Sequence, residues 1–166
     1  METVLILDFG AQYSQLIARR VREQNVYCEV KPCSISPDEI RKLAPIGIIL
    51  SGGPQSVYES VSLHVDPALF SLGIPVLGIC YGCQLMAYSL GGTVAAATEA
   101  TAREYGKTLT EFDTESAIFH GLPASSVTWM SHGDYISQVP DGFTVTAKTA
   151  VCPTAAMMFV DRKSVV

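Results

Sequence analysis

The first half of the sequence alternates short apolar runs with segments of helical periodicity, and this alternation limits the possible folds more than any other feature. Strands are predicted at residues 4–7, 27–31, 46–50 and 76–79. Helices are predicted at residues 13–22, from residue 37 onward, at 67–72 and at 82–90. Strands and helices that alternate about every 20–30 residues are typical of a doubly wound α/β fold, in which helices cover both faces of a mostly parallel sheet.

Two helices in this half carry specific local signals. Ser36 stands before Pro37, and Glu39 follows three residues after Ser36, which predicts a capping box at a helix start. The first helix is predicted to bury an apolar face spaced at i, i+3, i+4 and i+8, formed by Tyr13, Leu16, Ile17 and Val21.

The second half of the sequence has a different pattern. Shorter strands are predicted at residues 108–112, 127–130, 143–147 and 156–160, separated by turn residues such as those at 140–142. We expect these strands to take antiparallel or edge positions. Because 166 residues match the usual length of one domain and no linker is visible, a single domain is predicted over residues 1–166.

Charge and apolar content exclude several classes of partner. A net charge of −5 argues against a basic face for nucleic acid, and no run approaches the roughly 18 apolar residues of a membrane span. The five cysteines are an odd number, and the N-terminus lacks the basic segment of a signal peptide, so a reducing, cytoplasmic location is expected. Only Cys80 and Cys83 form a closely spaced pair, so a structural zinc site is not predicted. We expect neither a metal site nor a resident cofactor in this domain.

The segment around Cys80 is the strongest functional signal. A predicted strand leads directly to Cys80, with Gly78 two residues before it, Gly82 two residues after it, and a predicted helix next. This is the nucleophile-elbow pattern, with cysteine in place of serine. The N-terminus of the helix is expected to lower the pKa of the thiol and favour the thiolate.

A redox role for Cys80 and Cys83 is the alternative for this segment. Cys83 is predicted instead to face the core, because it falls on a helical apolar stripe with Met86, Ala87 and Leu90. Gln84 lies off that stripe, and we expect it to reach a ligand beside Cys80.

Two backbone N–H groups are candidates for an oxyanion hole. Residues 51–54 form a Ser-Gly-Gly-Pro turn after a predicted strand, where Gly53 lets its N–H approach a developing oxyanion closely. The N–H of Tyr81, directly after the nucleophile, is the second candidate. In open α/β sheets such turns at the carboxyl ends of strands meet at one binding edge.

Histidine is the usual base for a cysteine nucleophile, and the sequence has three. His132 belongs to a Ser-His-Gly-Asp segment at the end of a predicted strand, and His120 lies in a predicted loop. His64 precedes Asp66, which is better explained as a helix N-cap. None of the three is a convincing base for Cys80.

Residues 75–84 resemble the nucleophile segment of the class I, triad-type glutamine amidotransferases. Residues 5–13, 16–23, 51–54, 104–106 and 130–134 are similar to the amidotransferase half of the GMP synthases within that family. The resemblance covers essentially the whole chain. It implies a domain that hydrolyses the side-chain amide of L-glutamine, with Cys80 forming a γ-glutamyl thioester and the N–H groups of Gly53 and Tyr81 stabilising the oxyanion.

The same resemblance implies the residues and partners around the nucleophile. The glutamine would be held by Gln84, Ser131, His132 and Asp134. The ammonia would pass to an ATP-pyrophosphatase synthetase domain, which uses ATP and Mg²⁺ to aminate XMP to GMP. The full-length enzyme is a candidate homodimer.

The sequence departs from the family pattern in one respect. The family's base and its orienting carboxylate lie in a His-Pro-Glu segment after the region that matches residues 155–166, and this sequence contains no His-x-Glu. A truncated domain with low turnover is therefore expected, since the members of a triad act as a unit. The alternatives are a non-catalytic glutamine-binding or partner-regulating domain, and the glutaminase component of another class I amidotransferase.

Overall fold

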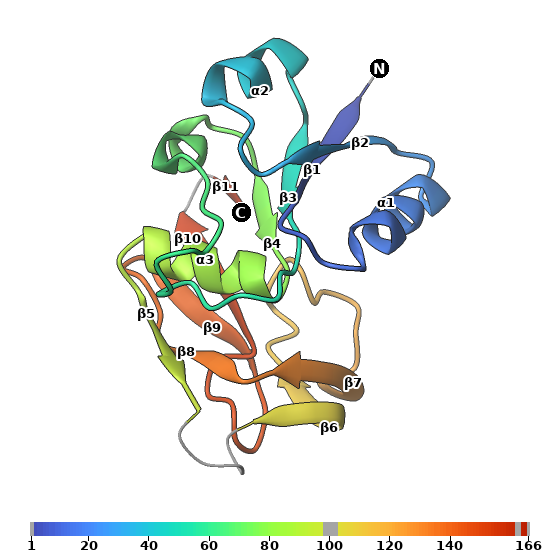
Figure 1. Cartoon of the computed structure of the whole chain (residues 1–166). Helices are drawn as coiled ribbons and strands as arrows, with labels where there is room; N and C mark the ends of the chain where they lie inside the picture. Colours follow the sequence, from blue (N-terminus) through green and yellow to red (C-terminus); the bar gives the residue numbers. More distant parts are fainter. Residues whose placement is uncertain (1, 98–102, 162–163, 166) are drawn as a thin grey trace. The chain divides into compact units, whose positions relative to one another are not determined.

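The computed structural model describes residues 2–97, 103–161 and 164–165. The chain divides into two compact units, Met1–Ser89 and Leu90–Val166, which are described separately (Figure 1). The single domain expected from the length of the sequence stays a prediction.

The first unit is built on a four-stranded parallel sheet with the order β2-β1-β3-β4. After β2 the chain crosses back over β1 to β3, so the direction of winding reverses between β1 and β3. Ligands bind beside such a reversal, at the carboxyl ends of the strands. The bounds of the strands are β1 Thr3–Asp8, β2 Tyr27–Pro32, β3 Gly47–Leu50 and β4 Val76–Gly78.

The helices of this unit begin and end close to their predicted positions. They are α1 Ser14–Glu23, α2 Pro37–Leu43, the 3₁₀ helix η1 Pro67–Ser71 and α3 Tyr81–Ser89. The capping box of α2 is confirmed, because the Ser36 hydroxyl accepts from the N–H of Glu39 and the Glu39 carboxylate accepts from the N–H of Ser36. Since right-handed crossovers are the rule, the reversal of winding places helices on both faces of the sheet.

The predicted apolar face of α1 is wrong in part. Tyr13 and Leu16 are exposed, whereas Ser14 and Ala18 are buried. The hydroxyl of Ser14 donates to the carboxylate of Asp8 at 2.7 Å, and this bond fixes a polar residue at the start of the buried face. Hydrophobic spacing alone therefore placed the face about one residue away from its observed position.

The core of the first unit lies along the central strand. Leu5, Ile6 and Leu7 are fully buried in β1, so both faces of this strand are covered, as expected for a central parallel strand. Ile6 packs with Ala18 of α1 and Cys28 of β2 in one apolar cluster. The sheet is thus a rigid base for the turns at its carboxyl edge.

The second unit contains antiparallel strands, as the sequence predicts. A five-stranded sheet has the order β11-β10-β9-β6-β7, and a two-stranded sheet pairs β5 with β8. β5 and β8 are absent from the sequence prediction because each is short and has little apolar alternation. The bounds are β5 Thr93–Ala96, β6 Glu104–Phe112, β7 Ser125–His132, β8 Asp134–Gln138, β9 Phe143–Lys148, β10 Ala156–Asp161 and β11 Ser164–Val165.

None of the helices in the described residues has both the length and the apolar character that a membrane crossing requires.

Candidate active site

Cys80 occupies a strained position between β4 and α3. Its φ is +53°, in the left-handed region that non-glycine residues rarely adopt, and the residue is exposed. Its carbonyl oxygen accepts the first hydrogen bonds of α3, from the N–H groups of Cys83 and Gln84 at 3.0 and 3.1 Å. Cys80 is therefore the residue on which the strand turns into the helix, as the elbow pattern predicts.

The two glycines of the elbow provide space for this turn. A Cβ atom on Gly82 would lie 2.3 Å from the carbonyl oxygen of Leu50, and one on Gly78 would lie 2.6 Å from the backbone nitrogen of Cys83. Neither glycine has a positive φ. The backbone strain lies on Cys80 itself, and the glycines allow the start of α3 to contact β3 and β4 directly.

The turn after β3 lies against the elbow. A Cβ atom on Gly52 would be 3.6 Å from the Cβ of Cys80, and one on Gly53 would be 3.2 Å from Cβ of Phe9 and Cγ of Tyr81. The proposed oxyanion donor Gly53 therefore sits tightly beside Tyr81. Gly52 was not predicted as a donor, although it belongs to the same motif, and its backbone is the part of this turn shown to lie beside Cys80.

Ser51, directly after β3, is bonded to the end of β1 and to the start of α3. Its hydroxyl accepts from the N–H of Phe9, directly after β1, at 3.2 Å. Its carbonyl oxygen accepts from the N–H of Gly82, in the first turn of α3, at 3.1 Å. Because Ser51 is fully buried, these bonds are shielded from water and hold the nucleophile and the Gly-Gly turn in a fixed relation.

Tyr81 anchors the start of α3. Its ring is buried and packs on Phe9 with the two ring centroids 5.4 Å apart, and its hydroxyl donates to the carbonyl of Leu63. The side chain therefore points into the unit, and the backbone N–H is the group of Tyr81 that lies at the elbow, where it donates to the sulfur of Cys80.

The surroundings of the Cys80 sulfur shift its pKa in the direction opposite to the sequence prediction. Partial burial of the sulfur raises the pKa of the thiol above its ordinary value, although the residue as a whole is exposed. A hydrogen bond from the N–H of Tyr81 lowers the pKa but does not offset the desolvation. The expected stabilisation of the thiolate by the helix N-terminus is therefore wrong as a net effect.

The predicted apolar stripe of α3 is also displaced. Leu85, Met86 and Ala87 are buried, whereas Cys83 is only half-buried and Leu90 is exposed. The buried face includes Tyr81 and Gly82 at the start of the helix, because these residues contact β3 and Phe9. Gln84 is half-buried in the first turn, and its glutamine-binding role stays a prediction.

His64 and Asp66 do not form a dyad. The Asp66 carboxylate accepts from the N–H of Ala68 and caps η1, as predicted, while the Nε2 of His64 lies 2.8 Å from the hydroxyl of Ser62.

Three predicted glutamine-binding residues belong to the second unit. Ser131 is exposed near the end of β7, His132 is the last residue of that strand, and Asp134 begins β8. The side chain of His132 points into its own unit, where its Nε2 lies 3.1 Å from the carboxylate of Glu104. Binding of glutamine by these three residues stays a prediction.

The sequence is similar to named enzymes over nearly its whole length. The GMP synthase (glutamine-hydrolyzing) of Clostridium botulinum strain Alaska E43 is 55% identical over 161 residues, and that of Thermobifida fusca is 56% identical over 162 residues. Each match covers 97% of this chain, whereas the chain spans only 31% and 30% of the length of these relatives.

Solved structures share the fold. A GMP synthase-like protein of Thermoplasma acidophilum is 30% identical, with a TM-score of 0.82 over 95% of this chain and 77% of its own. A glutamine amidotransferase of Thermotoga maritima is 20% identical, with a TM-score of 0.74 over 95% of this chain and 71% of its own. The family model for class-I glutamine amidotransferases matches residues 5–166. The chain therefore belongs to the class-I glutamine amidotransferase family.

Proposed function

We propose that this chain is the glutaminase part of a GMP synthase. It hydrolyses the side-chain amide of L-glutamine, and the ammonia released is used to aminate XMP to GMP. The proposal is supported by membership of the family and by 55% identity to a relative named GMP synthase (glutamine-hydrolyzing). The observation that carries it is the geometry of Cys80, an exposed residue at φ +53° between a buried strand and a helix.

The proposed reaction proceeds in two steps. The sulfur of Cys80 attacks the carboxamide carbon of glutamine, and the C–N bond breaks. Ammonia leaves, and a γ-glutamyl thioester remains on Cys80. Water then attacks the thioester, which releases glutamate and restores the thiol. The N–H groups of Gly53 and Tyr81 are the proposed donors to the oxyanion, and removal of one such donor typically slows a reaction by about 10²–10³-fold.

Proton transfer limits this chemistry in the 166-residue chain. Burial raises the pKa of the Cys80 thiol, which disfavours the reactive thiolate. In the class I glutamine amidotransferases, which this sequence resembles, the base that removes this proton belongs to a His-Pro-Glu segment. No such segment occurs in the 166 residues of this sequence. We expect the isolated chain to react with an electrophilic glutamine analogue but to release ammonia from glutamine slowly.

The proposed partner is an ATP-pyrophosphatase synthetase domain that uses ATP and Mg²⁺. The relatives named GMP synthase are about three times as long as the matched region, which leaves room for such a domain. A cytoplasmic location and a homodimer of the full-length enzyme belong to the same proposal.

Covalent labelling tests the role of Cys80. The chain is treated with a chloroketone analogue of glutamine, and peptide mass spectrometry locates the adduct. We expect selective modification of Cys80, slower modification in excess L-glutamine, and no adduct in Cys80→Ser. Cys83→Ser is the matched control and should be labelled like the wild type. No reaction, or equal labelling of Cys28 and Cys152, would favour a non-catalytic domain instead.

A further inference from the structure

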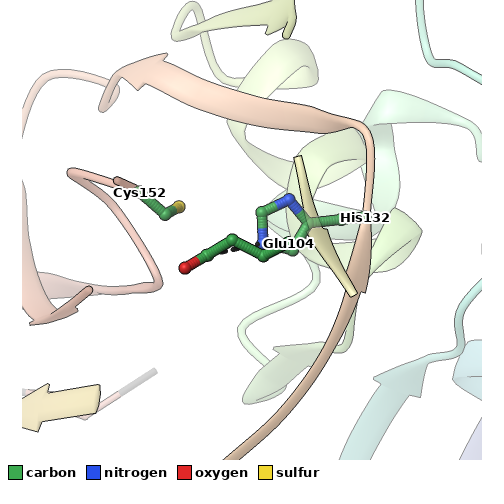
Figure 2. Close-up of side chains that lie close together, drawn as sticks. All are labelled: Glu104, His132 and Cys152. Carbon is green, nitrogen blue, oxygen red and sulfur yellow. Dashed lines mark hydrogen bonds and ion pairs between the residues drawn. The ribbon is translucent and has the colours of Figure 1, made fainter. Parts of the chain in front are cut away.

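Three side chains of the second unit, outside the Cys80 elbow, gather at one place. Glu104 comes from the start of β6, His132 from the end of β7, and Cys152 from the turn after β9. One metal-ligating atom of each lies within 4.8 Å of the other two. Figure 2 shows the sulfur of Cys152 turned toward the carboxylate of Glu104 and the ring of His132.

The backbone places these groups together independently of their side-chain chemistry. Glu104 and His132 are directly paired in the register of β6 and β7, so their side chains share one face of the sheet. Only 5% of the Glu104 side chain and 15% of the His132 side chain are exposed, and Cys152 is buried. A carboxylate held this far from water needs compensating partners.

The hydrogen bonds of the described residues satisfy only one of the two ring nitrogens of His132. The Nε2 of His132 lies 3.1 Å from Glu104 Oε2, but its Nδ1 is buried without a hydrogen-bond partner among the described residues. Buried polar atoms in a purely structural network are normally all paired. The unpaired nitrogen therefore indicates that a ligand belongs to this cluster.

A second layer of contacts orients the cluster. The hydroxyl of Thr149 donates to Glu104 Oε1 at 2.6 Å and accepts from the N–H of Cys152 at 2.9 Å. One side chain thus fixes both the carboxylate and the residue that carries the thiol. Outer contacts of this kind are typical of metal sites, where they orient the ligands.

We propose that Glu104, His132 and Cys152 bind a divalent transition-metal ion, with zinc as the best match. Sulfur, imidazole nitrogen and carboxylate oxygen together suit zinc, whereas magnesium and calcium prefer oxygen ligands alone. Zinc bonds of about 2.0–2.3 Å place tetrahedral ligands about 3.3–3.6 Å apart. The three ligand atoms lie within 4.8 Å of one another, so no pair needs to approach by more than about 1.5 Å. Three protein ligands leave a fourth position for water or another ligand.

The sequence does not reveal this site because its members are 28 and 20 residues apart and fit no spacing motif. Closely spaced cysteine pairs indicate structural zinc, and Cys152 forms no such pair in the sequence. The site would connect β6, β7 and the turn after β9, and it is independent of the proposed role of Cys80.

Cobalt binding tests the proposal on the whole 166-residue chain. The purified chain is freed of metal with a chelator and titrated with Co²⁺, and the thiolate-to-cobalt charge-transfer band is followed in the near ultraviolet. We expect one equivalent of Co²⁺ to bind, with displacement by Zn²⁺. The band should disappear in Cys152→Ser and persist in Cys80→Ser, the matched control that removes the thiol of the elbow instead.

Two further variants keep the test decisive if Cys152→Ser does not fold. His132→Gln retains every sulfur and should lose cobalt binding, and Glu104→Gln should weaken Zn²⁺ binding at least 10-fold. Zinc should raise the melting temperature of the wild type but not of His132→Gln. The proposal is overturned if wild type binds no stoichiometric Co²⁺, if the band survives in Cys152→Ser or His132→Gln, or if it is lost in Cys80→Ser. Labelling of Cys80 by the glutamine analogue reports on the glutaminase proposal separately.

Discussion

The replacement Gly82→Ala tests whether direct contact between α3 and β3 builds the nucleophile elbow. The added methyl group would lie 2.3 Å from the carbonyl oxygen and 2.6 Å from the Cβ of Leu50. Real Cβ atoms come no closer than about 3.0 Å and rarely closer than 3.4 Å. The start of α3 and the end of β3 must therefore separate by about 1 Å, and both contacting atoms belong to rigid parts of the chain rather than to a flexible side chain.

The expected cost is the balance of two opposing effects. Alanine in place of glycine within a helix stabilises the fold by about 1 kcal/mol. Overpacking a buried contact costs about 1–3 kcal/mol, and the upper end or beyond applies here because the neighbour is backbone. We expect a net loss of about 2 kcal/mol, which lowers the ratio of folded to unfolded protein about 30-fold. The carbonyl of Ser51 would also lose its bond from the N–H of residue 82, so labelling of Cys80 should slow.

Urea unfolding followed by circular dichroism measures this loss, and Gly47→Ala is the matched control. Gly47 begins the same strand, β3, but a Cβ there would lie at an ordinary 3.8 Å from the carbonyl oxygen of Pro75. This variant should be neutral or more stable by about 0.4–1 kcal/mol, because alanine restricts the unfolded chain. If Gly82→Ala matches Gly47→Ala within about 0.5 kcal/mol, the close contact does not shape the elbow.

Three further predictions follow from individual contacts. Burial raises the pKa of the Cys80 thiol, and only the thiolate reacts with iodoacetamide. The alkylation rate of Cys80 should therefore still rise with pH above the ordinary pKa of cysteine. A rate that levels off below the ordinary cysteine pKa would contradict the effect of burial. Ser36→Ala removes the capping box of α2 and should lower the free energy of unfolding by about 1 kcal/mol in urea titrations. Thr149→Val leaves the Glu104 carboxylate without one buried donor and should cost about 1–3 kcal/mol by the same measurement. Thr144→Val, at an exposed strand position, is its control and should change stability by less than about 0.5 kcal/mol.

The parallel half of the fold was predictable because its signals are local. The strand at residues 4–7 is a continuous apolar run, and the start of α2 is fixed by a capping box that the chain forms with its own neighbours. β5 and β8 were not predictable because their signals are not local. They pair with each other across about 40 residues of chain, and neither has the apolar alternation that would indicate a strand in isolation.

The faces of helices were less predictable than their bounds. A spacing rule identifies which residues share a face but not which face is buried when a polar side chain has a tertiary partner. Ser14 is buried because it bonds to Asp8, and that bond cannot be inferred from spacing. The pKa of Cys80 was misjudged in a similar way, since the motif indicates the helix N-terminus but gives no measure of how many atoms surround the sulfur.

The position of Cys80 and the chemistry of Cys80 therefore have different origins in this chain. The position is set by local contacts of the first unit. Cys80 has a positive φ, and the absence of a side chain at Gly82 lets α3 lie directly on β3. The buried hydroxyl of Ser51 bonds to the end of β1, and its carbonyl bonds to the start of α3. These contacts fix the backbone that carries the sulfur. The raised pKa disfavours the thiolate form of that sulfur, so a correctly placed nucleophile is not by itself an active one. A base acting on Cys80 should then accelerate turnover without moving the elbow, which is why labelling and ammonia release measure separate properties of this chain.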